Sequence, residues 1–372
     1  MVYADRLHRN LQLISDVSRR AGVTIIMAFK ANALWRTFDI IRRYTTGSTA
    51  SSLNELRLGR EFLRGDVHSY CPAYTESTIG EYLAGSSHIT FNSLDQWQRF
   101  RPTVEARNRS GAHVSPGLRV NPRCSVIETD IYNPALPGSR FGVEAKDLAE
   151  LPEGIEGLHF HALCESSSYD LAKVLEAFEL SFGHLLPKVK WVNLGGGHLM
   201  TRQGYDIEHL IGLLRDFRQR HPGVEVILEP GSAFTWRTGD LITSVVDVVE
   251  NDGIKTAIVD VSFACHMPDT LEMPYKPAIS ESVGVDSSLP TYRLGGNSCL
   301  SGDYMGDWSF AQPLQRGQRL TLEDMNHYTT VKTTMFNGID HPALVLADTD
   351  SPDSPCRYLR QFTYDDYKNR MD

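Results

Sequence analysis

The first two thirds of the sequence repeats one pattern, in which a short apolar run rich in β-formers is followed by a segment with helical spacing. Eight such runs occur, at residues 23–29, 47–52, 67–71, 88–91, 117–122, 154–163, 191–196 and 224–231. In the helical segment 4–22, Leu7, Leu11, Ile14 and Val17 fall on one face. Eight strands, most of which precede a helix, predict an α/β fold of the (β/α)8 TIM-barrel type. A doubly wound open sheet is the competing architecture.

The pattern changes after about residue 235. Strand-like runs follow one another with turn residues between them, at residues 241–250, 255–263, 291–296, 318–325 and 327–336. A chain of 372 residues is long enough for one large domain and a smaller one. The sequence therefore predicts a barrel over residues 1–235 and a C-terminal β-rich domain over residues 236–372.

Composition excludes several classes of protein. The net charge of −9 disfavours a nucleic-acid partner. No apolar run approaches the ~18 residues of a membrane span, and the N-terminus lacks the apolar core of a signal peptide. None of the six cysteines forms a Cys-x-x-Cys pair, which indicates neither a zinc site nor a disulfide framework. We therefore expect a cytoplasmic protein without metal.

Residues that directly follow the strands of a barrel gather at one rim, where barrel active sites lie. Lys30 follows the apolar run 25–29 in this way. A strand-end lysine most often extends its ammonium into solvent. The alternative is a desolvated amine with a lowered pKa, which can form a Schiff base. Lys30 taken alone leaves both interpretations open, and the solvated lysine is the more common case.

Two further segments reach the same rim. Gly195, Gly196 and Gly197 follow the seventh predicted strand. They either expose backbone N–H groups to an anion or form a tight turn that needs positive φ. Glu229 ends the eighth strand, where a carboxylate is costly unless it is paired. It can hold a proton on a heterocyclic nitrogen or take part in an ion pair inside the barrel.

Two other segments carry reactive residue types. His159 and His161 alternate and therefore face the same side of a strand. They are metal ligands without an identified third partner, or rings that pack on a flat cofactor, or core histidines; the first option would favour a metal-dependent barrel hydrolase. Cys299 and Asp303 lie in the Gly- and Ser-rich segment 293–310. Its composition suits a functional loop more than a strand, although an ordinary long turn is also possible.

Taken together, these segments resemble the fold-type III pyridoxal-phosphate enzymes, the group of alanine racemase and of ornithine and diaminopimelate decarboxylases. The shared order is Lys30, His161, the glycine loop 195–197, Glu229 in "EPG", and a Cys–Asp loop in a β-domain. Longer stretches, among them "GLRVNP", "ETDIYNPALPGSRFG", "LGGNSCLSGDYMGDWSF" and "HYTTVKTTMFNGI", resemble the carboxynorspermidine/carboxyspermidine decarboxylases within this group.

The resemblance implies a pyridoxal 5'-phosphate site, position by position. Lys30 corresponds to the Schiff-base lysine, and His161 to the ring stacked on the cofactor. Glu229 corresponds to the carboxylate that keeps the pyridine nitrogen protonated. The phosphate is expected at Gly195, Gly196, Gly197 and Tyr328.

The resemblance also implies a reaction and a partner. Cys299 corresponds to the acid that reprotonates the product carbon, and it would reach the site from the second subunit of a homodimer with shared active sites. Weaker candidates for substrate contacts are Arg140, Asp269, Glu272 and Asp303. The expected lyase reaction converts carboxynorspermidine or carboxyspermidine to norspermidine or spermidine in polyamine biosynthesis. The alternatives are a diaminopimelate- or ornithine-type decarboxylase, or a non-catalytic pyridoxal-phosphate carrier, which typically lacks the second domain.

Overall fold

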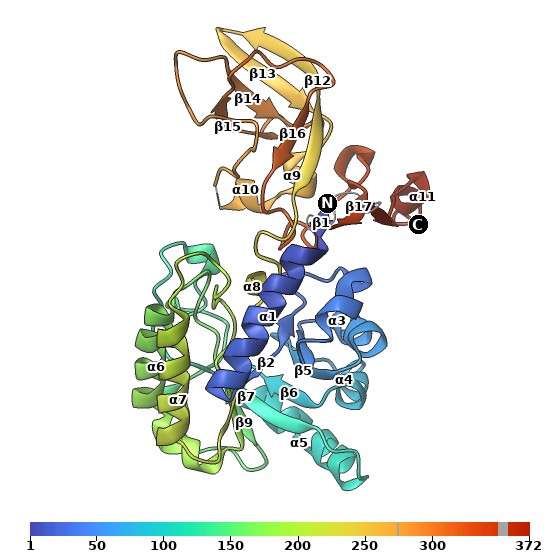
Figure 1. Cartoon of the computed structure of the whole chain (residues 1–372). Coiled ribbons are helices and arrows are strands. Elements are labelled where there is room, and N and C mark those ends of the chain that lie inside the picture. Colours follow the sequence, from blue (N-terminus) through green and yellow to red (C-terminus); the bar gives the residue numbers. More distant parts are fainter. Residues whose placement is uncertain (274, 349–355) are drawn as a thin grey trace. The chain divides into compact units, whose positions relative to one another are not determined.

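The computed structural model describes residues 1–273, 275–348 and 356–372. The chain divides into two compact units (Figure 1). One unit comprises His8–Phe234, and the other combines Met1–Leu7 with Thr235–Asp372.

The first unit is a closed barrel of parallel strands in the order β2-β11-β10-β9-β7-β6-β5-β4-β3. Its first strand is split into β2 (Thr24–Ile25), which pairs with β11, and β3 (Met27–Ala28), which pairs with β4, so that one segment closes the ring. The other strands are β4 (Gly47–Ala50), β5 (Asp66–Tyr70), β6 (His88–Phe91), β7 (Ser115–Asn121), β9 (Gly157–His159), β10 (Trp191–Asn193) and β11 (Glu225–Leu228), with β8 (Val143–Glu144) beside β7. The predicted eight-stranded barrel is confirmed, and the open sheet is excluded.

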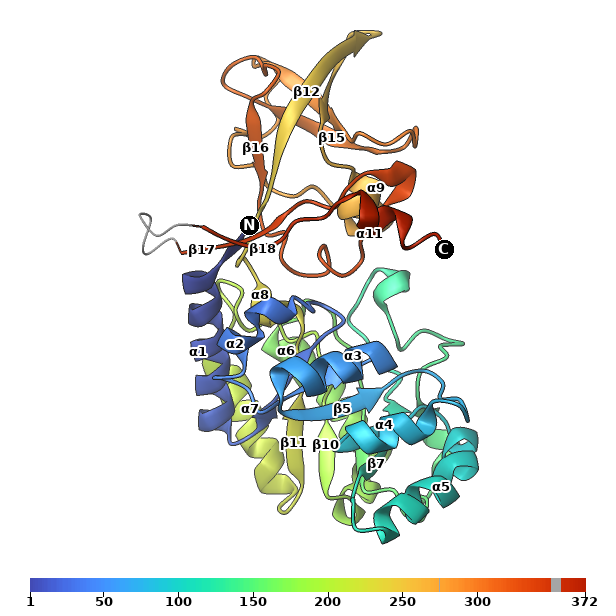
Figure 2. The ribbon, with the colours of Figure 1, turned by 90° about the vertical axis from the view of Figure 1, so that its right-hand side faces the viewer.

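Helices surround these strands (Figure 2). They are α1 (Ala4–Ala21), α2 (Phe38–Ile41), α3 (Leu53–Leu58), α4 (Ile79–Gly85), α5 (Leu94–Arg109), α6 (Ser168–Phe182), α7 (Ile207–Arg220) and α8 (Ser232–Thr235). Side-chain oxygens of Ser52, Ser93, Ser167 and Asp206 accept backbone N–H groups in the first turns of α3, α5, α6 and α7. These caps satisfy amides that have no partner within the helix, and they fix where each helix begins.

The helices bury one face each. The predicted stripe Leu7, Leu11, Ile14 and Val17 of α1 is fully buried, as its spacing indicates.

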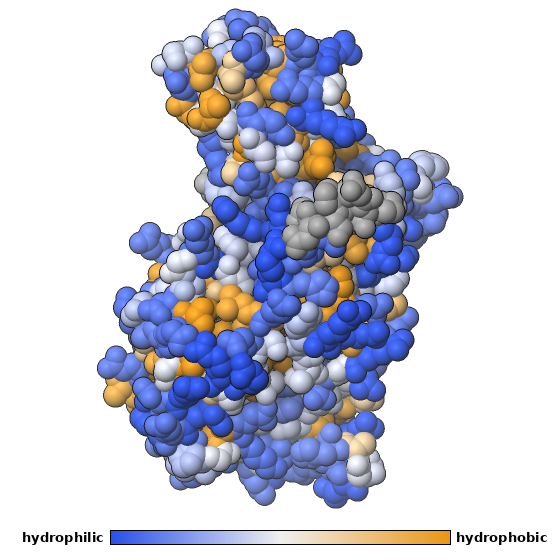
Figure 3. Space-filling model, viewed as in Figure 1, coloured by the Kyte–Doolittle hydropathy of each residue, from blue (hydrophilic) through white to orange (hydrophobic). Residues whose placement is uncertain are grey.

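Polar side chains dominate the face of the molecule seen in Figure 3, and the hydrophobic patches between them are small.

A tryptophan fills part of the barrel interior. Trp191 of β10 packs against Gly117 of β7 and Gly157 of β9, where any Cβ atom would overlap the indole ring. Its indole N–H donates to the hydroxyl of Ser115 at 2.8 Å. The two glycines are therefore required by close packing, and the interior is a filled core rather than a pore.

The second unit contains two sheets. The larger has the order β15-β14-β13-β12-β16, and the smaller β1-β17-β18. The strands are β1 (Val2–Tyr3), β12 (Leu241–Asn251), β13 (Ile254–Val259), β14 (Thr291–Gly295), β15 (Tyr304–Ser309), β16 (Arg319–Leu322), β17 (Leu344–Ala347) and β18 (Arg357–Arg360), and the short helices are α9 (Phe263–His266), α10 (Asp269–Glu272) and α11 (Tyr364–Lys368). The predicted β-rich character of this part of the chain is confirmed.

Two local predictions in this unit are wrong. Residues 327–336 form no strand: they contain turns in which the N–H groups of Val331 and Lys332 both donate to the carbonyl of Tyr328. The threonines and valine of this run have strand propensity, but tertiary contacts override it. Conversely, the end of the segment expected to be a loop forms the strand Tyr304–Ser309, which pairs with β14. This strand contains Gly306 and Asp307, and both residue types have low strand propensity, so the sequence did not predict it.

Within residues 1–273, 275–348 and 356–372, no helix combines the length and apolar character needed to cross a membrane.

Candidate active site

Lys30 lies two residues after the end of β3, and its side chain points at an imidazole. Its Nζ atom is 3.2 Å from Nε2 of His161. Burial lowers the pKa of Lys30, the nearby charge of Arg119 adds to this effect, and Glu229 opposes it. The solvated strand-end interpretation does not fit these surroundings.

The hydrogen bonds of His161 define the protonation state of the pair. The backbone N–H of Gly196 donates to His161 Nδ1 at 2.9 Å, so Nδ1 carries no proton. Burial lowers the pKa of His161 well below its usual value, so the ring is neutral and its proton sits on Nε2. The Nε2–H group therefore donates to Lys30, whose nitrogen must offer a lone pair. Lys30 is thus held as a neutral, nucleophilic amine.

Glu229 follows β11 and is buried, with both carboxylate oxygens engaged. Oε1 lies 3.2 Å from Nε2 of His159, and Oε2 accepts a hydrogen bond from the amide of Asn193 at 2.9 Å. Burial alone would raise the pKa of Glu229, but the hydrogen bonds from His159 and Asn193 outweigh it and lower this pKa. Burial lowers the pKa of His159, which favours a neutral partner ring. Glu229 is consequently a fixed anion in this site.

The glycine loop packs tightly against the neighbouring strand ends. Gly195 and Gly197 have φ of +73° and +88°, and a Cβ on Gly196 would lie 2.5 Å from the carbonyl oxygen of Glu229. The N–H of Glu229 donates to the carbonyl of Gly195 at 2.9 Å. A side chain on Gly196 would push the loop away from β11, so this glycine fixes the distance between the loop and Glu229.

The sequence analysis missed two buried groups at this site. Arg119 on β7 is only 4% exposed; its guanidinium lies over the rings of Tyr70 (4.6 Å) and Phe141 (4.4 Å) and donates to the carbonyl of His161 at 3.3 Å. His198 is buried beside the glycine loop, and burial lowers its pKa to about 4. An arginine inside an apolar strand was a signal, because a buried cation is costly unless the site needs it.

Cys299 and Asp303 lie in the second unit, in the loop between β14 and β15. Cys299 is exposed, and its backbone N–H donates to the side-chain oxygen of Asn337 at 2.7 Å. Asp303 is 4% exposed, and its carboxylate accepts the hydroxyl of Ser298 at 2.6 Å and the N–H of Ala264 at 3.0 Å. The carboxylate of Asp303 therefore organises the loop that presents Cys299.

The other candidate carboxylates of this unit are already paired. Asp269 and Glu272 on α10 both form ion pairs with Lys332. Tyr328, a predicted phosphate contact, is half-buried and adopts a positive φ of 47°. In the barrel unit, Arg140 is exposed, and its guanidinium lies 4.3 Å from the centroid of the adjacent aromatic ring.

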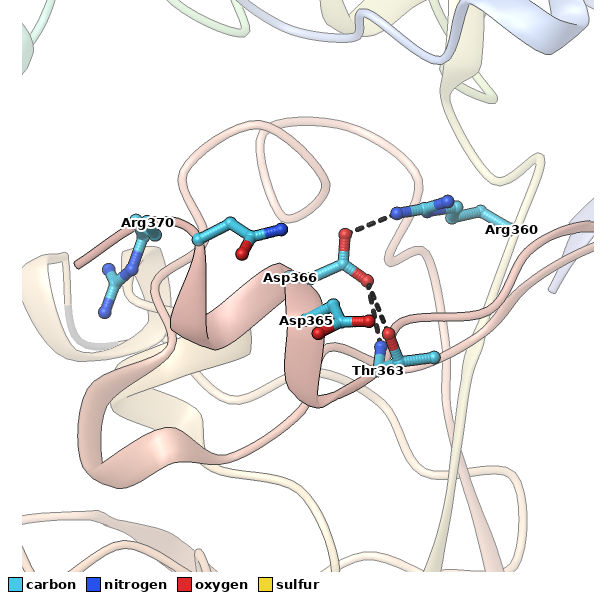
Figure 4. A pocket seen from close by; sticks show the side chains of 6 residues that line it. Arg360, Thr363, Asp365, Asp366 and Arg370 are labelled. Carbon is cyan, nitrogen blue, oxygen red and sulfur yellow. Dashed lines mark hydrogen bonds and ion pairs between the residues drawn. The ribbon is translucent and has the colours of Figure 1, made fainter. Parts of the chain in front are cut away.

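The polar residues that line a surface hollow beside α11 stabilise this helix. Figure 4 shows that the hollow is lined by Arg360, Thr363, Asp365, Asp366, Asn369 and Arg370. Asp366 accepts the N–H of Thr363 at 2.9 Å, and this hydrogen bond caps the N-terminus of α11. Asp366 also forms an ion pair with Arg360. The hollow contains none of the predicted site residues.

His159 and His161 would need a third ligand to bind a metal ion. Across the described part of the chain, no group of three or more histidine, cysteine, aspartate or glutamate side chains could hold a metal ion. The two rings instead contact Glu229 and Lys30 separately.

Comparison with known sequences shows close relatives along nearly the whole chain. Residues 82–326 match the family described as pyridoxal-dependent decarboxylase, C-terminal sheet domain. A carboxyaminopropylagmatine decarboxylase of Synechocystis sp. is 45% identical, over 98% of this chain and 92% of its own length. A carboxynorspermidine/carboxyspermidine decarboxylase of Campylobacter jejuni is 39% identical, over 98% of this chain and 96% of its own length.

A solved structure agrees with these matches. The crystal structure of carboxynorspermidine decarboxylase complexed with norspermidine, from Campylobacter jejuni, superposes with a TM-score of 0.89 at 38% identity. The match covers 100% of this chain and 98% of that one, so both units have counterparts in it.

Proposed function

Because this chain belongs to the pyridoxal-dependent decarboxylases, we propose that it removes CO2 from a carboxylated polyamine, yielding norspermidine from carboxynorspermidine or spermidine from carboxyspermidine. The observation that carries the proposal is the neutral amine of Lys30 beside His161 in the same site as the fixed anion Glu229. The substrate class rests on the relative from Campylobacter jejuni and on the norspermidine complex.

The residues of the barrel site fit pyridoxal phosphate. An aldehyde needs an unprotonated amine to bond to, and the hydrogen bonds of His161 leave Lys30 in that state. Lys30 would hold the cofactor covalently, with His161 against its ring and the glycine loop 195–197 near its phosphate. Tyr328 is proposed as a further phosphate contact.

The chain's own groups then have distinct tasks. When bound, pyridoxal phosphate supplies an electron sink for the negative charge left on carbon as CO2 departs. Glu229, ionised at neutral pH, would hold a proton on a ring nitrogen placed against it. Cys299 would deliver a proton to the product carbon from its thiol. Arg140, Asp269, Glu272 and Asp303 are proposed as substrate contacts, although the last three are engaged by groups of their own chain.

We further propose that the enzyme works in the cytoplasm as a homodimer that shares its active sites. The exposed position of Cys299 supports this, because a thiol on the surface of one subunit is available to a second copy of the chain.

A second candidate substrate is carboxyaminopropylagmatine. The Synechocystis relative that carries this name shares more identical residues with this chain, 45%, than the Campylobacter jejuni relative does at 39%. This substrate would end in a guanidinium where carboxynorspermidine ends in an ammonium. The reaction at the other end of the molecule would be the same.

The test is CO2 release by the purified holoenzyme from five compounds under identical conditions: carboxynorspermidine, carboxyspermidine, carboxyaminopropylagmatine, diaminopimelate and ornithine. We expect kcat/KM to be highest for one of the first three. A preference for diaminopimelate or ornithine would replace the proposal with the corresponding amino-acid decarboxylase. Cofactor binding without CO2 release from any of them would favour the carrier.

A further inference from the structure

A buried asparagine connects three segments at the rim of the barrel. Asn92 lies just past β6, and its Oδ1 accepts the hydroxyl of Tyr70 at 2.8 Å and the N–H of Gly142 at 3.0 Å. Its Nδ2 donates to the carbonyl of Arg140 at 2.8 Å. Only an amide offers an acceptor and a donor in this arrangement, so an aspartate cannot replace it without setting oxygen against oxygen.

The three bonds hold both aromatic neighbours of Arg119. Tyr70 is held through its own hydroxyl. Phe141 is held through the residues on either side of it, since the carbonyl before it and the amide after it both bond to Asn92. The guanidinium of Arg119 lies over both rings, at 4.6 Å and 4.4 Å from their centroids. One side chain thus sets both surfaces against which a buried cation rests.

We propose that Asn92 is a positioning residue that fixes the Tyr70–Phe141 contacts of Arg119 and thereby holds the charge of Arg119 beside His161 and Lys30. The inference rests on the proposed role of Lys30 as the cofactor-binding amine. It gives the rim loop 122–142 a task in the chemistry of the site, because Phe141 belongs to that loop.

The charge of Arg119 matters because Lys30 must stay neutral. Arg119 lowers the pKa of Lys30, so a guanidinium that moved away would let this pKa rise. The titratable and charged groups that face Lys30 come from four segments and are Glu55, Arg119, His159, His161, Cys164 and Glu229. Arg119 is the cation among them, and burial lowers the pKa of His161 and so favours a neutral ring.

The experiment measures how pH affects the attachment of pyridoxal phosphate to the cofactor-stripped full-length protein, followed by the visible absorbance of the bound cofactor. We expect Asn92→Ala to raise the pH midpoint of attachment by roughly 0.5 to 1 unit, because Lys30 then loses its proton at higher pH. Tyr70→Phe, which removes one hydroxyl only, should shift the midpoint in the same direction by less. This milder variant keeps the test decisive if Asn92→Ala folds poorly.

Two comparisons separate positioning from simple stabilisation. Asn108→Ala is the matched control, because Asn108 also clamps backbone through two hydrogen bonds, to the N–H and the carbonyl of Val114, and should leave the midpoint unchanged. Arg119→Met should raise the midpoint, and adding Asn92→Ala to it should produce no further shift.

An unshifted midpoint in Asn92→Ala and Tyr70→Phe, or an equal shift in Asn108→Ala, would overturn the inference while leaving the proposed function intact. Borohydride reduction of the wild-type holoenzyme tests that function separately. If it fixed the cofactor to a lysine other than Lys30, both would fail.

Discussion

Two reactive groups of the barrel, Lys30 and Glu229, are held differently from the exposed Cys299 of the second unit. In the barrel, burial lowers the pKa of Lys30, and the hydrogen bonds from His159 and Asn193 lower the pKa of Glu229 against the opposite effect of burial. In the second unit, Cys299 is exposed, and Asp269 and Glu272 both pair with Lys332 of their own chain.

The difference shows where this chain prepares its chemistry in advance. Burial makes charge interactions strong, so the barrel sets the protonation states of its groups before any ligand arrives. Water screens the charges of the exposed residues of the second unit. Changes in the barrel should therefore affect the state of the cofactor, whereas changes at Cys299 should affect turnover alone.

The largest effect is expected from Lys30→Ala. Without the neutral amine, CO2 release should fall by several orders of magnitude, and borohydride should no longer fix the cofactor to the protein. Mass spectrometry of the reduced wild-type enzyme should find the label on the peptide that contains Lys30. Lys190→Ala is the control, since Lys190 is an exposed lysine paired with Glu156, and it should behave as wild type. Label on any other lysine would contradict the assignment.

A smaller loss is expected from Glu229→Gln. The amide keeps the size of the side chain but removes the anion, so kcat should fall roughly 100- to 1000-fold while the cofactor still attaches to Lys30. Steady-state kinetics and the cofactor spectrum measure the two effects. Glu225→Gln, on the exposed start of the same strand, should change neither. An unaltered kcat in Glu229→Gln would remove the fixed anion from the mechanism.

Much of the fold follows from the sequence, because the barrel strands are short apolar runs with glycine, proline or polar residues at their ends. The one failure among the strand-like runs of the second unit, residues 327–336, is informative. Its Lys332 pairs with two carboxylates of α10, and Tyr328 takes a positive φ. Both features come from tertiary structure, which strand propensity does not contain.

The site was predictable where function follows from position at a strand end. Lys30, His161 and Glu229 each follow a barrel strand, and barrel topology brings such residues together. Arg119 lies within a strand, and Asn92 precedes a serine that caps α5, so that its surroundings look like an ordinary helix start. Their roles depend on contacts with residues up to 50 positions away in the sequence, which spacing alone does not reveal.

Cys299→Ala tests the other side of the comparison. Loss of a general acid should lower kcat by about 100-fold, with the cofactor spectrum and its attachment to Lys30 unchanged. The matched control is Cys356→Ala, because Cys356 is also exposed, and it should retain full activity. A changed cofactor spectrum in Cys299→Ala would mean that the exposed loop contributes to the tuning that we assign to the barrel.

The smallest effect concerns stability, and it measures the cost of placing the half-buried amine of Lys30 in the barrel. In the unfolded chain Lys30 takes up a proton below its usual pKa of 10.5, whereas the folded protein takes it up only at a lower pH. Between these two values the unfolded state binds more protons at Lys30, so the contribution of Lys30 to the free energy of unfolding of the cofactor-free protein should fall as the pH falls. Each unit by which the pKa is lowered corresponds to about 1.4 kcal/mol.

Lys30→Met cannot titrate and escapes this cost. Its stability advantage over wild type should therefore grow as the pH decreases from above 10.5 toward neutrality, and denaturant unfolding at a series of pH values measures it. Every other ionisable group is common to both proteins, so the difference between them reports Lys30 alone. Lys190→Met, at an exposed position, should show no such pH dependence. A constant difference between Lys30→Met and wild type would mean that Lys30 is protonated as easily in the barrel as in water. The contrast between the barrel and the second unit would then fail at Lys30, the most reactive residue of the barrel.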